Sequence, residues 1–210
     1  RESITAKLTA NLLEKSGVDR VLAMDLHSAQ IQGYFDIPCD HIYGSPVLID
    51  YLETLNLNEV VVVSPDVGGV ARARAFAKQM KDAPLAIIDK RRAAHNIAES
   101  LTVIGEVKDK TAILIDDMID TGGTICSGAN LLKKEGAKRI FACASHAVFS
   151  PPSYERLSTK DLFEQVIVTN SIPVVIKDSF PQLKVLSVAN MLGEAIWRIH
   201  EESSVSSMFR

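Results

Sequence analysis

The segment Ile113–Thr124 limits the possible folds of this chain more than any other. It opens with an apolar run typical of a buried strand, which leads directly into the adjacent acids Asp116 and Asp117. The turn Asp120-Thr121-Gly122-Gly123-Thr124 follows, and Ser127–Glu135 has the pattern of a helix. A buried strand that passes through a glycine turn into a helix favours an α/β fold with a parallel sheet.

The turn itself has the composition of an anion-binding site. Gly122 and Gly123 let the backbone turn tightly and bring its N–H groups close to a ligand. Thr121 and Thr124 add hydroxyl donors at the positive end of the helix dipole. The pattern therefore predicts that a phosphate monoester binds at this turn.

The two acids before the turn suit a different part of the ligand. Because like charges repel, Asp116 and Asp117 do not favour a phosphate directly. Their carboxylates are suited to accept hydrogen bonds from sugar hydroxyls or to hold a cation. Acids and turn together predict a sugar-phosphate site, and the alternative for this stretch alone is an ordinary acidic turn after a buried strand.

A second segment repeats the order of strand, glycine turn and helix. Val60–Val63 is a run of four β-branched residues, which suits a strand buried on both faces. The turn Asp66-Val67-Gly68-Gly69 comes soon after it, and apolar residues at helical spacing predict a helix over Val70–Met80. We expect this turn to bind a second phosphate-rich group or one that carries a metal ion.

Cations follow a third predicted strand, Leu85–Asp89. Lys90 and Arg92 come directly after it, and the common alternative for such a run is a solvated charged loop. Its place favours a role in binding, because ligands of open α/β sheets collect at the carboxyl ends of the strands. Cations, N–H-rich turns and carboxylates that hold Mg²⁺ are the parts that phosphoryl transfer needs. This chemistry alone does not choose between a kinase and a transferase.

The remaining patterns predict one continuous α/β domain over residues 1–210, with helices on both faces of the sheet and an edge hairpin. Further strands are expected at Val21–Asp25, Thr102–Val107, Ile140–Ser145, Gln165–Thr169 and Val185–Ser187. Further helices are expected at Ile4–Leu13, Pro46–Leu55, Ser153–Leu157 and Val188–His200. The segment Gln30–Pro38 has no clear period and indicates a loop or a short helical turn. The polar tail Ser203–Phe209 has the composition of a disordered end.

The overall charge indicates small ligands. The formal net charge is −3 with acids and bases interspersed, so the chain lacks the basic stripe that duplex nucleic acid requires. No apolar run is long enough to span a membrane. The cysteines Cys39, Cys126 and Cys143 lack any Cys-x-x-Cys spacing, which gives no sign of a disulfide framework or a structural zinc site and fits a reducing cytoplasm.

His27 follows the first predicted strand and has two interpretations. The ordinary one is a polar residue that hydrogen-bonds to its neighbours. The functional one is a nucleotide contact or a metal ligand. Because Mg²⁺ prefers oxygen to imidazole, a cation near His27 is expected to be held more firmly by Asp66.

Four motifs stand in a fixed order along the chain, at Asp25–Asp40, Ser64–Gly69, Ile88–Arg92 and Asp116–Thr124. Together they resemble the signatures of the ribose-phosphate pyrophosphokinases, also called phosphoribosyl pyrophosphate synthetases. The last motif alone is shared with the wider phosphoribosyltransferase group, whereas the first is not. The resemblance runs from Arg1 to Phe209 and implies a parallel-sheet, type I phosphoribosyltransferase-like fold.

The resemblance implies Mg²⁺-dependent transfer of the diphosphoryl group of ATP to O1 of ribose 5-phosphate, which gives 5-phosphoribosyl 1-pyrophosphate and AMP. It implies that His27 and Asp66 are the metal-associated pair, and that Lys90 and Arg92 are catalytic residues of a loop. The diphosphate loop that it implies is Asp66-Val67-Gly68-Gly69. The ribose 5-phosphate contacts that it implies are Arg92, Asp116, Asp117, Asp120, Thr121, Gly122, Gly123 and Thr124.

The resemblance also carries expectations for assembly. Family members have a further amino-terminal domain of similar fold, which supplies ATP contacts and is absent from this sequence. The resemblance is therefore compatible with a chain that is inactive by itself. Family members form homohexamers with a regulatory site for ADP and phosphate, and the tail Ser203–Phe209 resembles the part that reaches this site and is ordered by assembly. Two alternatives are a phosphoribosyltransferase, which the motif Asp25–Asp40 disfavours, and a non-catalytic regulatory relative, which Lys90 and Arg92 disfavour.

Overall fold

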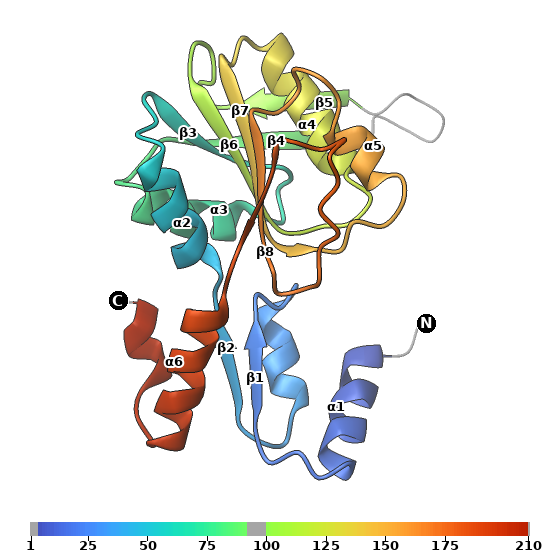
Figure 1. The fold of residues 1–210 in the computed structure, drawn as a ribbon, viewed down its shortest axis with the longest axis vertical. Helices are drawn as coiled ribbons and strands as arrows, with labels where there is room; N and C mark the ends of the chain where they lie inside the picture. The colour runs from blue at the N-terminus through green and yellow to red at the C-terminus, as the bar shows by residue number, and fades with distance from the viewer. Residues whose placement is uncertain (1–3, 92–99, 210) are drawn as a thin grey trace. The chain divides into compact units, whose positions relative to one another are not determined.

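The computed structural model describes residues 4–91 and 100–209. The chain divides into two compact units (Figure 1). One unit comprises Arg1–Pro46 and Val188–Arg210, and the other comprises Val47–Ser187. The larger unit holds most of the predicted site.

The order of the elements alternates between strands and helices along most of the chain. The strands are β1 (Val21–Met24), β2 (Cys39–Ile42), β3 (Val60–Ser64), β4 (Leu85–Arg91), β5 (Ser100–Ile104), β6 (Thr111–Ile119), β7 (Arg139–Ala147), β8 (Gln165–Thr169) and β9 (Leu183–Leu186). The α-helices are α1 (Thr5–Lys15), α2 (Ser45–Thr54), α3 (Val70–Gln79), α4 (Gly123–Lys134), α5 (Ser153–Leu157) and α6 (Ala189–His200). Two short 3₁₀ helices are η1 (Ala29–Tyr34) and η2 (Val205–Phe209).

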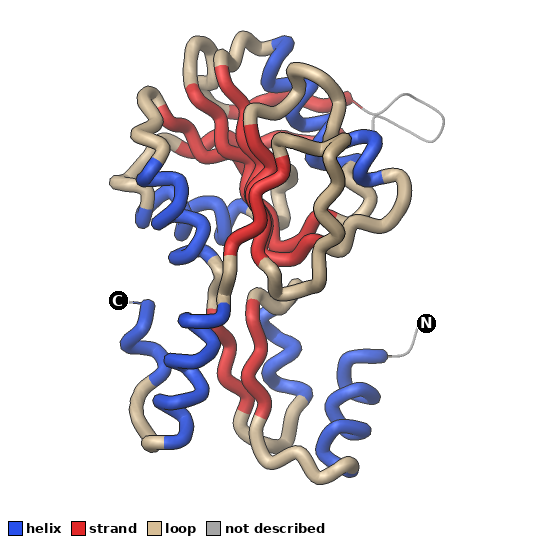
Figure 2. Tube along the Cα trace, viewed as in Figure 1, coloured by secondary structure: helices blue, strands red, loops and turns tan. Residues whose placement is uncertain are grey.

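The larger unit is built on a seven-stranded sheet with the order β5-β4-β3-β6-β7-β8-β9, seen as the long red strands of Figure 2. All neighbouring strands are parallel except β4 and β5, which form an antiparallel pair at one edge. The predicted parallel sheet and edge hairpin are therefore confirmed. In the centre, Val60 pairs with Thr111 and Val63 with Leu114, so β3 and β6 run side by side.

Apolar side chains cover both faces of this sheet. On one face, α2 and α3 pack through residues such as Leu52 and Phe76 against Ile113 and Phe141. On the other face, α4 and α5 pack against the alternate residues of the same strands, as Leu114 shows. Strands buried on both faces explain the continuous apolar runs in the sequence. Helices on both faces, as predicted, are visible in Figure 1.

The smaller unit pairs β1 with β2 in parallel, with Val21 opposite Cys39. Its core contains Ile42, Ala195 and Val205, which come from β2, α6 and η2. Val205 lies within the tail Ser203–Phe209, whose composition predicts disorder. That prediction is wrong: Val205 is buried, and the ring of Phe209 packs edge-on against Tyr43 at 5.8 Å.

Three further expectations need correction. Strand β2 is not predicted by the sequence pattern, because Cys39–Ile42 contains two polar residues and lacks a clean alternation. The strand expected at Thr102–Val107 lies at Ser100–Ile104. Helix α4 begins at Gly123, four residues before the expected start at Ser127, because Gly122 in the left-handed region ends the turn early. Among the described residues, no helix is long and apolar enough to cross a membrane.

Candidate active site

The two predicted glycine turns follow adjacent strands of the central sheet. β3 leads into Asp66-Val67-Gly68-Gly69 and β6 leads into Asp120-Thr121-Gly122-Gly123-Thr124. Because β3 and β6 are parallel neighbours, their carboxyl ends lie at one edge of the sheet. The structure therefore brings the two turns to the same edge, as the sequence predicts.

The turn after β6 is shaped for an anion. Gly122 has φ of +73° and stands at the N-cap of α4, where no side chain of the described residues caps the helix. Its carbonyl accepts the N–H of Cys126 at 3.0 Å, and the helix runs on from Gly123. The first N–H groups of an α-helix lack partners within the helix and favour negative charge. Nearby backbone donors and the exposed hydroxyls of Thr121 and Thr124 suit a phosphate group.

Arg156 is a cation at this turn that the sequence analysis missed. Its Nη1 donates a hydrogen bond to the carbonyl of Thr121 at 3.1 Å. The same nitrogen would lie 3.4 Å from a Cβ placed on Gly123. Within the described part of the chain, no acidic side chain forms an ion pair with Arg156. Arg156 lies in α5, about 35 residues away in sequence from the turn, so no local pattern could reveal it.

Asp116 and Asp117 lie at the end of β6 and share one arginine. The Nη1 of Arg72 is 3.1 Å from Oδ1 of Asp116 and 3.2 Å from Oδ1 of Asp117. The side chain of Asp117 is only 2% exposed, that of Asp116 21% and that of Arg72 29%. The N–H of Asp117 also donates to Oδ1 of Asp116 at 2.9 Å. Arg72 was not among the predicted site residues.

Burial raises the pKa of Asp116 to about 7, and a side-chain hydrogen bond with Asp117 adds to the rise, whereas the backbone N–H of Asp117 lowers it. The positive charge of Arg72 also opposes the rise. A carboxyl group that titrates near neutral pH at the edge of an α/β sheet is typical of a functional site. The partly exposed Asp116 thus offers a carboxylate acceptor in a partly dry environment, which suits a hydroxyl group of a ligand, and the buried Asp117 lies behind it.

The turn after β3 differs because its own acid closes it. Oδ1 of Asp66 accepts the N–H of Gly69 at 2.8 Å, and the hydroxyl of Ser64 donates to the carbonyl of Asp66 at 2.7 Å. A Cβ on Gly69 would lie 2.9 Å from the Ser64 hydroxyl, so only glycine fits there without a shift. Val67 is exposed. Asp66 is exposed and is held on the turn, so its carboxylate is placed for a cation.

Lys90 lies in β4, next to β3 in the sheet, and its side chain is exposed. It pairs with Leu101 of the antiparallel strand β5. The structure therefore keeps Lys90 on the strand that neighbours the first turn. Arg92, the second predicted cation of this loop, lies outside the described residues.

His27 belongs to the smaller unit, where it follows β1 and is exposed. The backbone around it is fixed by its neighbours: Nε2 of His41 accepts the N–H of Leu26 at 2.9 Å, and Asp25 accepts the N–H of Gly44 at 2.7 Å. Since Asp66 belongs to the other unit, the metal pair of His27 and Asp66 stays a prediction. In the described ranges, no three His, Cys, Asp or Glu side chains form a ready-made metal cluster.

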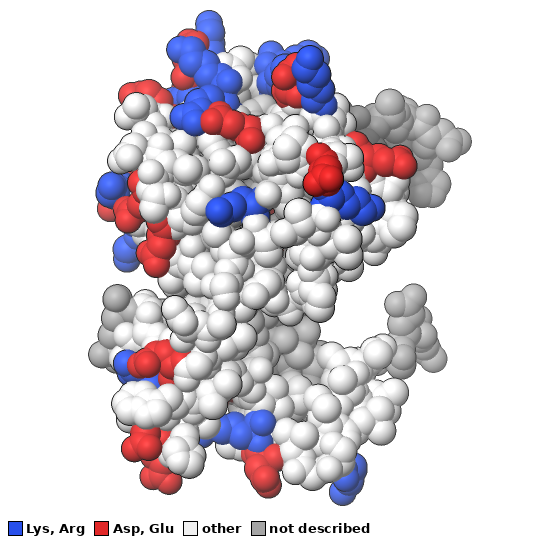
Figure 3. Space-filling model, viewed as in Figure 1, with Lys and Arg blue, Asp and Glu red and all other residues white. Residues whose placement is uncertain are grey.

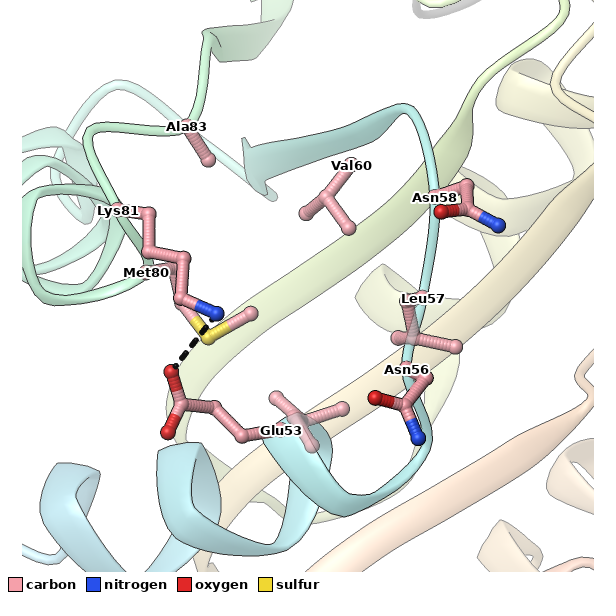
Figure 4. Close-up of a pocket in the computed structure, with 9 residues that line it drawn as sticks. Glu53, Asn56, Leu57, Asn58, Val60, Met80, Lys81 and Ala83 are labelled. Carbon is pink, nitrogen blue, oxygen red and sulfur yellow. Dashed lines mark ion pairs between the residues drawn. The ribbon is translucent and has the colours of Figure 1, made fainter.

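A cavity of about 370 Å³ lies at the opposite end of β3 (Figure 4). Its lining comes from the end of α2, from the start of β3 at Val60 and from the chain after α3, including Met80. Lys81 and Glu53 form an ion pair of 3.4 Å across it. Ligands of open α/β sheets bind at the carboxyl ends of the strands, so this cavity is not the candidate site.

On the face that Figure 3 shows, Lys and Arg side chains lie beside Asp and Glu side chains, and no large region of one sign is visible.

Comparison with known proteins identifies the family. The family model of the phosphoribosyl synthetase-associated domain matches residues 92–210, which is more than half of the chain. The chain belongs to the phosphoribosyl synthetase-associated family. It is 94% identical over 210 residues to a ribose-phosphate pyrophosphokinase of Prochlorococcus marinus subsp. pastoris, covering all of this chain and 63% of that protein. It is 64% identical over 212 residues to ribose-phosphate pyrophosphokinase 1 of Spinacia oleracea, again with 63% of that protein covered.

A solved structure agrees with this family. The crystal structure of phosphoribosylpyrophosphate synthetase from Mycobacterium smegmatis matches with a TM-score of 0.89 and 44% identity. The match covers 97% of this chain and 66% of that one. This phosphoribosyl synthetase-associated chain therefore has the predicted fold, and it spans less than two thirds of the length of the curated relatives it matches.

Proposed function

We propose that the chain forms the sugar-phosphate part of a ribose-phosphate diphosphokinase. The enzyme would transfer the diphosphoryl group of ATP to O1 of ribose 5-phosphate and release AMP, for nucleotide biosynthesis. The observation that carries the proposal is the pair of glycine turns on adjacent parallel strands, in a chain 94% identical to a ribose-phosphate pyrophosphokinase over its whole length. That likeness supports the substrate, donor and product that we propose.

In the proposed complex, the turn Asp120–Thr124 binds the 5-phosphate of the sugar through its N–H groups and hydroxyls. Asp116 accepts hydrogen bonds from the ribose hydroxyls with the buried Asp117 behind it, and Arg156 adds positive charge beside the phosphate. The turn Asp66–Gly69 faces the diphosphoryl group. In these roles the charge of each protein group complements the part of the ligand that it contacts, and both turns lie at the same edge of the sheet.

Mg²⁺ is the metal that we propose, since the exposed oxygens of Asp66 suit a hard cation that prefers carboxylates and substrate phosphates. His27 is proposed as its second protein contact. When bound, the metal would neutralise charge on the transferred group. Lys90 and Arg92 are proposed to approach the same group as catalytic cations.

We also propose that the enzyme works in the cytoplasm as a homohexamer with a regulatory site for ADP and phosphate. The three free cysteines, Cys39, Cys126 and Cys143, are compatible with a reducing compartment. The order of η2, at the tail expected near the regulatory site, supports a role of this segment in assembly.

The test is AMP formation from ATP, Mg²⁺ and ribose 5-phosphate, measured on this chain and on the chain extended to the full length of its relatives. The expected result is AMP and phosphoribosyl pyrophosphate in equal amounts from the extended chain. Ribose 5-phosphate binding without AMP would favour a regulatory relative. Consumption of phosphoribosyl pyrophosphate with a nucleobase would favour a phosphoribosyltransferase.

Lys90→Ala in the extended chain should lower turnover by about 10³-fold, as removal of a group that stabilises transition-state charge does. The affinity for ribose 5-phosphate should change little, because Lys90 lies on the strand next to the diphosphate turn. Near-normal turnover would remove Lys90 from the mechanism. Lys78→Ala, an exposed lysine of α3, is the matched control.

A further inference from the structure

Arg72 connects the two turns of the proposed site through a single side chain. It lies in the first turn of α3, three residues after Gly69, so its helix begins directly at the turn after β3. Its Nη1 reaches the acids at the end of the neighbouring strand β6, at 3.1 Å from Asp116 and 3.2 Å from Asp117. The contact therefore joins the element that carries the diphosphate turn to the carboxylates of the sugar site.

The two acids need such a partner. Asp117 is 2% exposed, and a buried carboxylate without a counter-charge is strongly unfavourable. Asp116 lies next to it, so the two negative charges repel each other. In the described residues, Arg72 is the cation that forms ion pairs with both. Its charge is therefore used within the protein and is a poor candidate for binding substrate phosphate.

The same contacts fix the direction of one carboxylate. Oδ1 of Asp116 accepts from Nη1 of Arg72 at 3.1 Å and from the N–H of Asp117 at 2.9 Å. Two donors on one oxygen, one from α3 and one from β6, restrict the rotation of the Asp116 side chain. A side chain held in this way loses less entropy when a ligand binds to it.

We propose that Arg72 is a positioning residue of the sugar site, which pairs with the buried Asp117 and holds the carboxylate of Asp116 in place as an acceptor for ribose hydroxyls. This inference rests on the proposed function and deepens it. Arg72 acts through the two acids and contacts neither the phosphate nor the transferred group. Its loss should therefore weaken recognition of the sugar hydroxyls more than any other step.

The experiment compares ribose 5-phosphate with 2-deoxyribose 5-phosphate, which lacks one hydroxyl, in the chain extended to the full length of its relatives. Arg72→Gln should raise the KM for ribose 5-phosphate roughly 10- to 100-fold, the range for hydrogen bonds that involve charged groups. The KM for ATP and kcat should change by less than about threefold. The preference for the ribose over the deoxyribose compound should fall toward one.

The controls separate this role from a purely structural one. Arg74→Gln removes the same charge from the same helix at an exposed position and should leave all three quantities unchanged. Arg72→Lys keeps the charge but lacks the planar guanidinium, so it should recover part of the hydroxyl preference. If the glutamine variant does not fold, the lysine variant alone decides. Its preference for ribose 5-phosphate over the deoxyribose compound is expected to be smaller than that of wild type but still present.

A hydroxyl preference in both Arg72 variants equal to that of wild type would overturn the inference, even if the enzyme is active. Equal losses in the KM for ATP and for ribose 5-phosphate would also overturn it, because they indicate general damage. If the wild-type protein binds no ribose 5-phosphate, the proposed function itself fails, and the inference fails with it.

Discussion

The turns after β3 and β6 share the same parts, yet different charged groups lie against their backbones. In the turn after β3, the carboxylate of Asp66 accepts the N–H of Gly69 and remains exposed. Neither α3 nor α4 has a side-chain cap among the described residues, but in the turn after β6 the guanidinium of Arg156 lies against Thr121. The first turn offers a negative group and suits a cation, whereas the second offers donors and suits a phosphate. Two glycines alone therefore do not determine which ligand a turn binds. The ligand depends on the charged side chain that lies against the backbone of the turn.

The largest effect is expected at the left-handed glycine of the second turn. Gly122→Val places a β-branched residue at φ of +73°, with its Cβ 3.4 Å from Cγ of Leu157. The strain should destabilise the fold by about 1–2 kcal/mol, and the distorted turn should weaken ribose 5-phosphate binding by roughly 100-fold, about 2.7 kcal/mol. Calorimetric titration and thermal unfolding measure the two effects.

Gly136→Val is the matched control, because Gly136 follows the other end of α4 and has φ of +87°. It should cost similar stability without loss of affinity. If both variants lose the same affinity, the loss comes from the stability of α4, and the second turn has no special role.

The next largest effect should appear at the first turn. Asp66→Asn removes the charge that is proposed to hold Mg²⁺ but keeps an oxygen that accepts the N–H of Gly69. The Mg²⁺ concentration for half-maximal activity should rise roughly 10- to 100-fold, as in other weakened metal sites. The affinity for ribose 5-phosphate should stay the same. Asp120→Asn, the matching acid of the second turn, should leave the Mg²⁺ requirement unchanged, and a reversed pattern would show that the two turns have been assigned the wrong way round.

A smaller effect is expected at the cation of the second turn. Arg156→Gln should weaken ribose 5-phosphate binding about fivefold, because the exposed guanidinium is screened by water. Binding of ribose without phosphate should not change, which separates a phosphate contact from a general one. Lys160→Gln, an exposed neighbour, is the control. Equal losses for ribose and ribose 5-phosphate would exclude Arg156 as a phosphate contact.

The last expected effect concerns stability and is the pH dependence from Asp116. Its pKa is raised from 3.8 to about 7 in the fold, so the folded state binds this proton more tightly than the unfolded state. Its contribution to stability is complete below about pH 4 and is lost as the pH rises through 7, by at most about 1.4 kcal/mol per pH unit. Urea unfolding at pH 5 and pH 7 should show this decline, and Asp116→Asn should remove it. Ribose 5-phosphate affinity should rise over the same range, since the ionised carboxylate is the better acceptor; a parallel fall of both would contradict the assigned role.

Most of the fold could be predicted because its strands are buried on both faces. Runs such as Val60–Val63 and Ile113–Ile115 can lie nowhere else than in the centre of the sheet. β2 escaped prediction because half of its residues are polar. The prediction of a disordered tail was wrong because composition does not show that Val205 is buried against β2 and α6.

The site could be predicted where it is local in sequence. The turns Asp66–Gly69 and Asp120–Thr124 each combine acid, glycines and helix start within a few residues. Arg72 and Arg156 could not be found in this way, since they act across 44 and 35 residues respectively. Each is one basic residue on an ordinary helix face, and only the packing of α3 and α5 against the sheet shows its partner.

The order of the strands has a consequence for how such a protein can vary. From the central pair β3 and β6, the chain builds outward in two directions, through β4 and β5 on one side and through β7, β8 and β9 on the other. The helix after β3 crosses one face of the sheet and the helix after β6 crosses the opposite face. The chain therefore leaves the two turns toward opposite faces, at the point where the strand order reverses direction. At one outer edge, β8 and β9 are remote from this reversal, whereas β5 at the other edge pairs with Lys90. The strands β8 and β9 can lengthen, shorten or gain new partners while the ligand site keeps its geometry.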